Sequence, residues 1–351
     1  MLSKFSLLPL TSRFRAKLGR ARPIWSRAAE KVELAPADES SALPVIALPG
    51  EFERVIDVNP LSTFVTERKY IGATRIDQGP TIGYRFENAI LADNTLYAAG
   101  LLEVARSGNK RPFLIGPYEK YEAAQLCAHS PSNIYFGHWL RDALAMELLA
   151  LQRGLIPLSY VRKPWLHEPG YREIMELPGH PVSFALVRDL WTIDDRGLNA
   201  SWRKRFSELR RRVRRAATGE SPSRVFLARG RHGESRELIN AGEISEALAA
   251  RGFVSIEPEV LTPLQIVNSL ASAKIVVSVE GSALNHAQFA LPSNAAILVI
   301  QPPKRFTAFH KQLADFSGLR FGYVVGDPAV GGFTLAPGRL LRTLDLVEAA
   351  I

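Results

Sequence analysis

The chain has 351 residues, 46% of them hydrophobic, which suits two domains with a substantial core and excludes disorder over most of the length. Its longest apolar runs have the length of strands, far below the roughly 20 residues that a membrane-spanning helix needs. The single cysteine, Cys127, excludes an intrachain disulfide and a cysteine-based zinc site, and it favours a cytoplasmic location.

Two basic segments account for the net charge of +9. Residues 1–29 carry basic side chains and no acidic one, and residues 203–215 carry eight basic residues against one acid, Glu208. The rest of the chain is mildly acidic. Such segments suit an anionic membrane surface, which predicts a peripheral position at its inner face. Nucleic acid is the weaker alternative, because the aromatic residues of the second segment lie on the apolar face of a predicted helix.

In chain order, residues 1–44 are expected to form a basic tail followed by a linker rich in Ala, Pro, Glu and Ser. Residues 45–117 alternate short apolar runs with Gly, Pro, Asn and Asp, which predicts strands, among them 45–48, 81–86 and 113–115. Leucines three or four positions apart predict a helix over residues 138–152.

Residues 197–217 predict an amphipathic helix with a basic outer face, which is either solvated or in contact with anionic lipid. Its apolar positions recur every three or four residues: Leu198, Trp202, Phe206, Leu209 and Val213.

Strands and helices alternate over residues 218–325, which predicts a parallel sheet covered by helices on both faces, a Rossmann-like domain. Asn240 and Glu243 resemble a capping box at the start of one helix, and Pro263 suits the first turn of the next. Residues 326–351 are expected to form a C-terminal extension that ends in a helix.

Polar residues follow one predicted strand of this domain, residues 274–279. Gly281 and Ser282 open a turn into a helix, and ligands of parallel sheets bind beyond the carboxyl ends of the strands. Glu280 ends the strand; its carboxylate would repel a diphosphate, so ribose or sugar hydroxyls are its better partners. A plain structural turn is the alternative.

Arginines follow another predicted strand, residues 224–228, whose carboxyl end lies at the same sheet edge. Arg229 and Arg236 could donate to phosphate oxygens through their planar guanidinium groups, with Arg231 and His232 nearby. A solvated arginine-rich loop is the alternative.

A third group of residues lies at the start of the helix predicted over 138–152. His138 and Asp142 are four residues apart, so the carboxylate could orient the imidazole. Such a histidine is either catalytic or a structural residue with satisfied hydrogen bonds, and Trp139 is expected in the core.

Several blocks resemble, in the same order, glycosyltransferase family 61, which includes bacterial capsular-polysaccharide biosynthesis proteins. NIYFGHWLRD at 133–142 is similar to the family's GHWLxD block, VFLAR at 225–229 to a strand ending in Ser-Arg, and RELIN at 236–240 to an R-x-x-x-N block. EGSALNH at 280–286 stands where the family usually has a block that begins His-Gly. The resemblance covers about residues 125–302.

The resemblance implies a GT-B-like α/β fold, in which two Rossmann-like domains face each other across a cleft. Residues 45–217 would be the acceptor-side domain and residues 218–325 the nucleotide-sugar-binding domain. An inverting transfer without a metal or other cofactor is implied, so positive charge must stabilise the departing nucleotide diphosphate. Arg229, Arg236 and the amides after Gly281 are the expected diphosphate contacts.

His138, with Asp142, is the expected base that deprotonates the acceptor hydroxyl. The chain departs from the family at Glu280, where His is commoner, and at Ala228, which replaces Ser. We therefore expect an inverting glycosyltransferase that moves a sugar from a nucleotide-sugar donor to a cell-surface polysaccharide or a lipid-linked glycan. A non-catalytic homologue that binds a nucleotide sugar or a glycan is the alternative, because of Glu280.

Overall fold

The computed structural model describes residues 7–17, 23–105, 118–228 and 237–351. The chain forms two compact units, each built from two stretches: Met1–Asp38 with Gln78–Leu209, the first unit, and Glu39–Asp77 with Arg210–Ile351, the second unit. Both units contain a sheet and helices, so the α/β class is confirmed.

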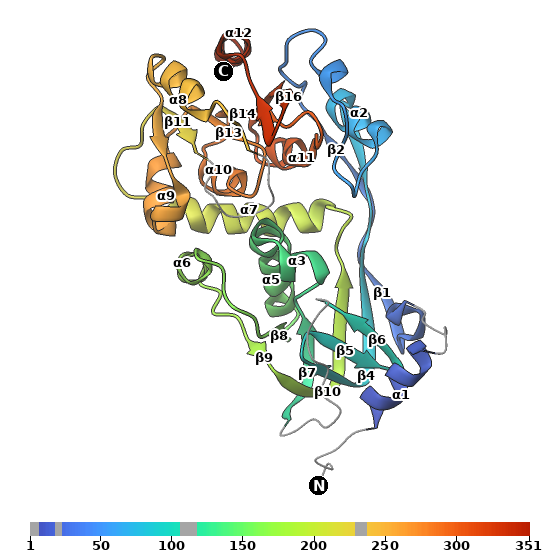
Figure 1. Ribbon diagram of the computed structural model, residues 1–351. Coiled ribbons are helices and arrows are strands. Elements are labelled where there is room, and N and C mark those ends of the chain that lie inside the picture. The colour runs from blue at the N-terminus through green and yellow to red at the C-terminus, as the bar shows by residue number, and fades with distance from the viewer. Residues whose placement is uncertain (1–6, 18–22, 106–117, 229–236) are drawn as a thin grey trace. The chain divides into compact units, whose positions relative to one another are not determined.

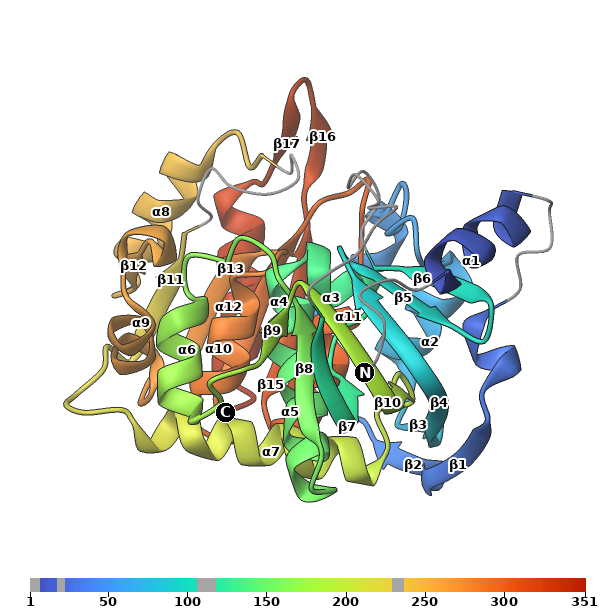
Figure 2. The ribbon, with the colours of Figure 1, turned by 90° about the horizontal axis from the view of Figure 1, so that it is seen from below.

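The first unit is built on a mixed sheet whose strands follow the order β6-β5-β4-β10-β7-β8-β9, with β1 also paired to β4. Strands β10, β7, β8 and β9 are parallel, whereas β4 is antiparallel to β10, β5 and β1 (Figure 2). The strands are β1 (Glu30–Ala35), β4 (Thr81–Ala92), β5 (Thr95–Ala98), β6 (Leu101–Val104), β7 (Glu119–Leu126), β8 (Ile156–Tyr160), β9 (Pro181–Val182) and β10 (Phe184–Asp194).

A continuous run of helix follows β7 in the first unit (Figure 1). It comprises α4 (Phe136–His138), the π-helical turn η3 (Trp139–Ala143) and α5 (Leu144–Gln152), and it covers the helix expected over residues 138–152. Its leucines at 140, 144 and 148 are buried, as the spacing predicts, and Leu151 is exposed. The other helices are α1 (Leu8–Lys17), η1 (Ile24–Arg27), α3 (Ser130–Ile134), α6 (Glu168–Met175) and α7 (Ala200–Arg215), which continues into the second unit.

The described residues of 1–44, where the sequence predicts a basic tail and a linker, contain helices and strands. The segment Glu30–Ala35 pairs with β4 as an antiparallel strand. Ile24 is buried in the core of the first unit, and the guanidinium of Arg13 donates to the Tyr97 hydroxyl at 2.7 Å. Burial of Ile24 and the strand pairing provide contacts that a free linker lacks, so this part of the chain is folded.

The second unit is built on a parallel sheet with the strand order β12-β11-β13-β14-β15. β11, the first of these strands in the sequence, thus lies between β12 and β13. This order creates a topological switch point at β11 and β13, where parallel sheets bind ligands beyond the carboxyl ends. The strands are β11 (Arg224–Leu227), β12 (Val254–Ile256), β13 (Ile275–Val279), β14 (Ala296–Gln301) and β15 (Arg320–Val325).

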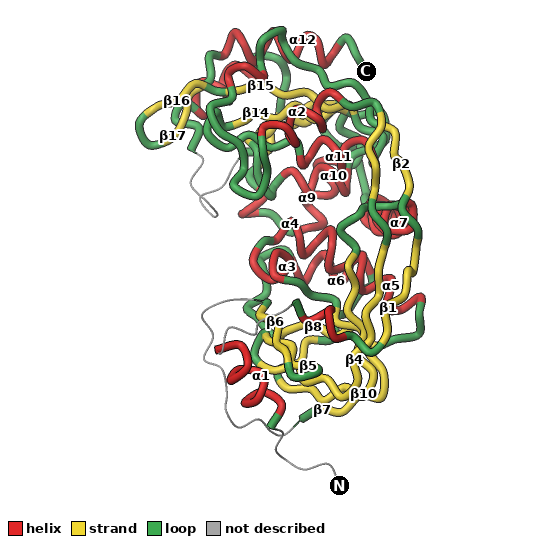
Figure 3. Tube along the Cα trace, turned by 90° about the vertical axis from the view of Figure 1, so that its right-hand side faces the viewer, coloured by secondary structure: helices red, strands yellow, loops and turns green. Residues whose placement is uncertain are grey.

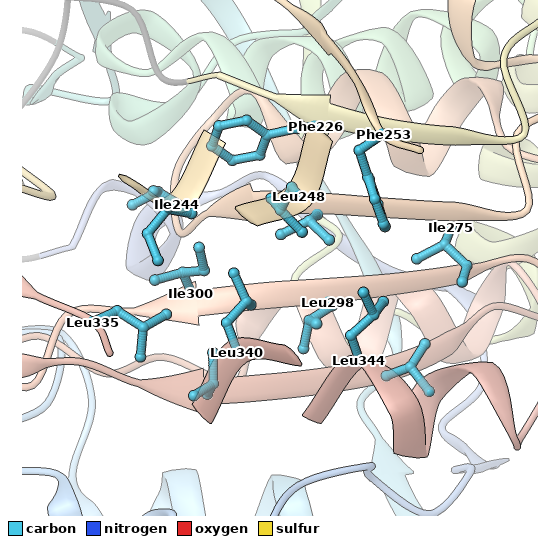
Figure 4. Close-up of a cluster of buried hydrophobic side chains, with 14 of the residues drawn as sticks. Phe226, Ile244, Leu248, Phe253, Ile275, Leu298, Ile300, Leu335, Leu340 and Leu344 are labelled. Carbon is cyan, nitrogen blue, oxygen red and sulfur yellow. The ribbon is translucent and has the colours of Figure 1, made fainter. Parts of the chain in front are cut away.

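Helices pack apolar side chains onto this sheet, and α12 is one of them. Leu340 and Leu344 of α12 lie in the same buried cluster as Ile275 and Leu298 (Figure 4). Residues 326–351 therefore belong to the body of the second unit. Its helices are η2 (Phe52–Arg54), α2 (Phe64–Gly72), α8 (Ala241–Ala249), η4 (Pro258–Val260), α9 (Pro263–Leu270), α10 (Leu284–Ala290), α11 (Phe309–Phe316) and α12 (Pro337–Glu348).

Two further sheets in the described chain have only two short strands each. The strands β16 (Asp327–Ala329) and β17 (Gly332–Thr334) form a hairpin (Figure 3), and β2 (Asp38–Ser41) pairs with β3 (Arg75–Gln78). No helix in the described ranges is both long and apolar enough to cross a membrane.

Two local expectations are wrong, and one falls outside the described residues. Residues 45–48 do not form a strand; Ile46 makes an isolated parallel bridge to Gly322, which ties this stretch to the second unit. Asn240 precedes α8 but its side chain does not cap the helix. It donates to the Leu335 carbonyl at 2.9 Å and to Glu243 Oε2 at 3.0 Å, and its oxygen accepts from the Leu335 amide instead of a helix amide. The strand expected over 113–115 is not described.

Candidate functional site

The first unit brings the two residues of the GHWLRD segment into contact. His138 Nδ1 lies 2.8 Å from Asp142 Oδ2, four residues further along the helix. The intervening residues belong to the π-helical turn. This conformation is rare in proteins as a whole, but where it occurs it often lies at a functional site. The His138 side chain is 32% exposed and the Asp142 side chain 14%, so the imidazole is accessible while its carboxylate partner is shielded.

Arg141 completes this pair from the same turn. Its Nη2 lies 2.5 Å from Asp142 Oδ2 and its Nε donates to Oδ1, so the guanidinium holds both carboxylate oxygens. Burial raises the pKa of Asp142, but the Arg141 charge and the hydrogen bonds from His138 and Arg141 together hold it well below its usual range. Asp142 is therefore a fixed anion, and the proton shared with His138 belongs on the imidazole.

His129, which no local motif marks, also faces the Oδ2 atom of Asp142. His129 follows β7, and its Nδ1 accepts a hydrogen bond from the Ser132 amide at 3.1 Å, which caps α3. Nε2 therefore carries the proton and lies 3.8 Å from Asp142 Oδ2. Burial lowers the pKa of His129 from its usual 6.5 to about 4, so this ring is neutral near pH 7. The only local signal in the sequence was a histidine at a strand end before Ser-Pro-Ser.

The carboxyl end of β10 brings further charges to the same sheet edge. β10 runs parallel to β7, with Thr192 opposite Leu126, so the residues that follow both strands emerge together. Arg196 pairs with Asp194 at 2.7 Å, and its positive charge is one of the influences that lower the pKa of His129. No local sequence pattern marks these residues, because only the strand pairing brings them near His129.

This arrangement can move a proton. The proton on His138 Nδ1 is held by the Asp142 carboxylate, which leaves Nε2 with a lone pair for a hydroxyl proton. Arg141 Nη2 also lies 3.0 Å from Nδ1, but it is already bonded to Asp142, and the shorter contact to the carboxylate decides the tautomer. The group thus has the geometry of a general base and its orienting carboxylate.

In the second unit, Glu280 directly follows β13 at the switch point. Its amide donates to the Ile300 carbonyl at 2.9 Å, and its side chain is buried. His310 of α11 places Nε2 3.8 Å from Glu280 Oε1, and Gln288 places its amide nitrogen 3.1 Å from His310 Nδ1. If Gln288 donates to Nδ1, Nε2 carries the proton that faces Glu280. The carboxylate expected to bind hydroxyls thus has a histidine ring 3.8 Å away.

The turn that follows Glu280 is more open than the glutamate. Ser282 is exposed and Gly281 is half-buried, and α10 begins two residues after Ser282. Ser278 of β13 donates to the Leu227 carbonyl at 2.9 Å, which fixes the carboxyl ends of β13 and β11 side by side.

Not every predicted site residue can be placed. Ala228 follows β11 at the edge shared with Glu280 and donates to the Ile256 carbonyl. Arg229 and Arg236, with Arg231 and His232, lie outside the described residues. Within the described part of the chain, no group of three His, Cys, Asp or Glu side chains is placed to hold a metal ion.

Many arginines of the basic segment 203–215 are used inside the protein. Arg205 is buried and bonds to Asp195, and Arg210 is buried with bonds to the carbonyls of Gln288 and Leu291 at the end of α10. Burial lowers the pKa of Arg210 to about 10. A fully solvated basic face is therefore wrong for these positions, because carbonyls and a carboxylate in the interior attract the cations.

Comparison with known proteins gives a family match over both units. A family model described as Glycosyltransferase 61 matches residues 136–298, which include His138, Asp142 and the Glu280 turn. No curated protein matches the chain. A flavodoxin-like domain from Synechococcus sp. has a TM-score of 0.27 at 14% identity, over 36% of this chain and 97% of its own.

A second solved structure, a metal-soaked flavodiiron core from Synechocystis sp. PCC6803, has a TM-score of 0.26 at 12% identity, over 73% of this chain and 60% of its own. Likenesses at this level carry no argument about fold or function. The family match rests on sequence, and it agrees with the resemblance seen in the ordered blocks. Residues 136–298 of this chain match the glycosyltransferase 61 family.

Proposed function

We propose that this protein is an inverting, metal-independent glycosyltransferase that moves a sugar from a nucleotide-sugar donor to a hydroxyl of a cell-surface polysaccharide or a lipid-linked glycan. The observation that carries the proposal is the contact of His138 with Asp142 inside the region that matches the family. An accessible imidazole oriented by a shielded carboxylate is what deprotonation of an acceptor hydroxyl requires.

The proposed reaction is a single displacement. The acceptor oxygen attacks the anomeric carbon of the donor while its proton passes to His138 Nε2. The bond between the anomeric carbon and the diphosphate oxygen breaks, and its electron pair leaves with the nucleotide diphosphate. Asp142 stabilises the imidazolium that forms, as the fixed carboxylate does in other histidine bases. Attack from the face opposite the leaving group inverts the anomeric configuration.

Donor binding is proposed for the carboxyl edge of the second unit. Glu280 would accept hydrogen bonds from ribose or sugar hydroxyls, and Gly281 and Ser282 would contact the donor through the turn. Arg229 and Arg236 would neutralise the diphosphate as it departs. We also propose that the two units are arranged as in a GT-B fold, facing each other across a cleft, and that the first unit binds the acceptor.

A donor panel tests the function. A thermal-shift screen of nucleotides and nucleotide sugars should find a stabilising donor, because a ligand at 100 times its Kd adds about 2.7 kcal/mol. Release of nucleotide diphosphate should then depend on an acceptor, and NMR of the product should show the inverted anomer. Donor binding without either hydrolysis or transfer would favour the non-catalytic homologue, and retention of configuration would overturn the single displacement.

The proposed place of action is the cytoplasmic face of a membrane, with the basic segments as the contact. Sedimentation with anionic and neutral vesicles at low and high salt tests this, because salt screens surface charge. Equal sedimentation with both kinds of vesicle would contradict it.

A further inference from the structure

A cavity of about 320 Å³ lies in the first unit beside, and separate from, the His138–Asp142 pair. Its walls come from η3 and from α3, α5, α6 and β8, the last four of which are labelled in Figure 1. Trp139, the residue after the proposed base, is part of the wall. Several prolines and Trp139 make much of the lining apolar.

The charged residues of the cavity wall neutralise one another. Arg172 holds Glu147 with both terminal nitrogens, at 3.1 and 3.2 Å, and donates through Nε to Glu168 at 3.0 Å. Arg162 lies 2.7 Å from the other oxygen of Glu168. Two guanidinium groups thus face two carboxylates, and the lining within the described chain offers no unbalanced charge to an ion. A neutral ligand fits this wall better than an anion or a cation.

The Trp139 indole is held rigidly and has an unused donor. Its ring lies 5.7 Å from the Trp165 ring and 5.9 Å from the Phe136 ring, between centroids, and Arg162 stacks on Trp165. Trp139 is only 2% exposed, and its Nε1–H has no acceptor among the residues that the structure describes. Buried N–H groups nearly always find a partner, because an unmade hydrogen bond is costly, so this one points to a ligand oxygen.

We propose that this cavity binds a neutral sugar ring of the acceptor glycan, with a ring hydroxyl or ether oxygen accepting from Trp139 Nε1. This rests on the proposed function. A pyranose presents C–H groups on its faces and oxygens at its edge, which matches apolar walls with one convergent donor. The volume lies at the lower end of the range for small-ligand pockets, about 300–1,000 Å³, so one ring fits better than an oligosaccharide.

Binding measured without any donor tests the proposal independently of catalysis. Saturation-transfer NMR on the full chain would use methyl glycosides of neutral hexoses and pentoses, with glucuronate as a charged comparison. At least one neutral glycoside should bind, and more tightly than glucuronate. Trp139→Phe keeps an aromatic ring but removes the N–H, and it should weaken that binding about tenfold. Trp191→Phe makes the same change on β10, outside the cavity, and should leave the affinity unchanged.

A second variant guards against a folding defect. Ala128→Leu would fill the cavity from a half-buried position on its wall and should abolish glycoside binding, a larger loss than that of Trp139→Phe. Thermal melting would show that both variants are folded. The proposal is overturned if no neutral glycoside binds the native protein, or if folded Trp139→Phe and Ala128→Leu bind as it does. Glycoside binding that depends on Trp139, in a protein that transfers no sugar, would uphold this site and overturn the proposed function.

Discussion

The carboxyl edges of the two sheets carry different chemistry. At the edge of the first unit, titratable side chains gather around one carboxylate: His138 and His129 both face Asp142 Oδ2, and Arg141 fixes the carboxylate. At the edge of the second unit, Glu280 is a buried carboxylate backed by His310, and an open turn follows it. We propose that the first arrangement holds and moves a proton and that the second recognises a ligand.

The difference shows how one type of sheet edge can serve two roles. In both units parallel strands bring separate segments together, so the edge is a place where side chains meet. Its chemistry then depends on the helix that follows. In the first unit this helix supplies His138 and Asp142 one turn apart, whereas in the second unit α10 supplies Gln288, which orients His310.

The largest effect is expected when the base of the first edge is removed. His138→Ala should lower turnover by roughly 10²–10⁴-fold, the scale of general-base loss, with donor affinity little changed. Initial rates and donor titration measure this. Asp142→Asn should cost less if the carboxylate only orients the ring. His180→Gln is the control: it changes a histidine that is hydrogen-bonded to the Tyr121 hydroxyl, and it should leave turnover near the native value. Native turnover in His138→Ala would contradict the proposal that the first edge supplies the base.

The second edge should affect binding more than chemistry. Glu280→Gln should weaken donor affinity by about tenfold or somewhat more, because hydrogen bonds to a charged group contribute about 1.5–3 kcal/mol. Calorimetric titration with the donor checks this, and turnover at saturating donor should change less than affinity. Glu246→Gln, on the exposed face of α8, is the matched control. A loss of turnover with unchanged donor affinity would reverse the roles assigned to the two edges.

The helix behind the second edge should be less stable without its buried cation. Arg210→Met removes the guanidinium that bonds to the Gln288 and Leu291 carbonyls, which would leave those carbonyls short of a donor. We expect the free energy of unfolding to fall by about 1–3 kcal/mol, measured in urea. Lys204→Met alters an exposed position of α7, the helix that carries Arg210, and should change the free energy of unfolding little. Equal stability of both variants would show that α10 does not depend on this contact.

The smallest effect concerns the pH response of the first edge. His129 has a folded pKa of about 4 against a usual 6.5, so the unfolded chain binds the proton more readily. The free energy of unfolding should therefore fall as the pH falls from 6.5 to 4, by about 1–2 kcal/mol after allowance for partial exposure of the ring. His129→Asn should flatten this slope in urea unfolding series at pH 7 and pH 5. His180→Asn should keep it, and an unchanged slope in His129→Asn would place its cause elsewhere.

Local spacing alone was enough for several parts of the molecule. The strand–helix alternation from Arg224 to Gln301 was visible because buried strands and amphipathic helices have fixed periods, and the structure has a parallel sheet there. The contact of His138 with Asp142 follows from the helical repeat, which places residues four apart on one face. The family blocks were likewise visible as ordered sequence.

Tertiary structure decided what depends on residues distant in the chain. His129 and Arg196 share an edge because β7 and β10 pair, and a pairing across some 60 residues leaves no local pattern. Glu30–Ala35 looked like a linker until β4 supplied its partner, and α12 looked like an extension until the sheet of the second unit covered its leucines. The sequence shows how many arginines α7 carries. Only the folded chain shows that Arg205 and Arg210 are inside, because the carboxylate and carbonyls that hold them come from other elements.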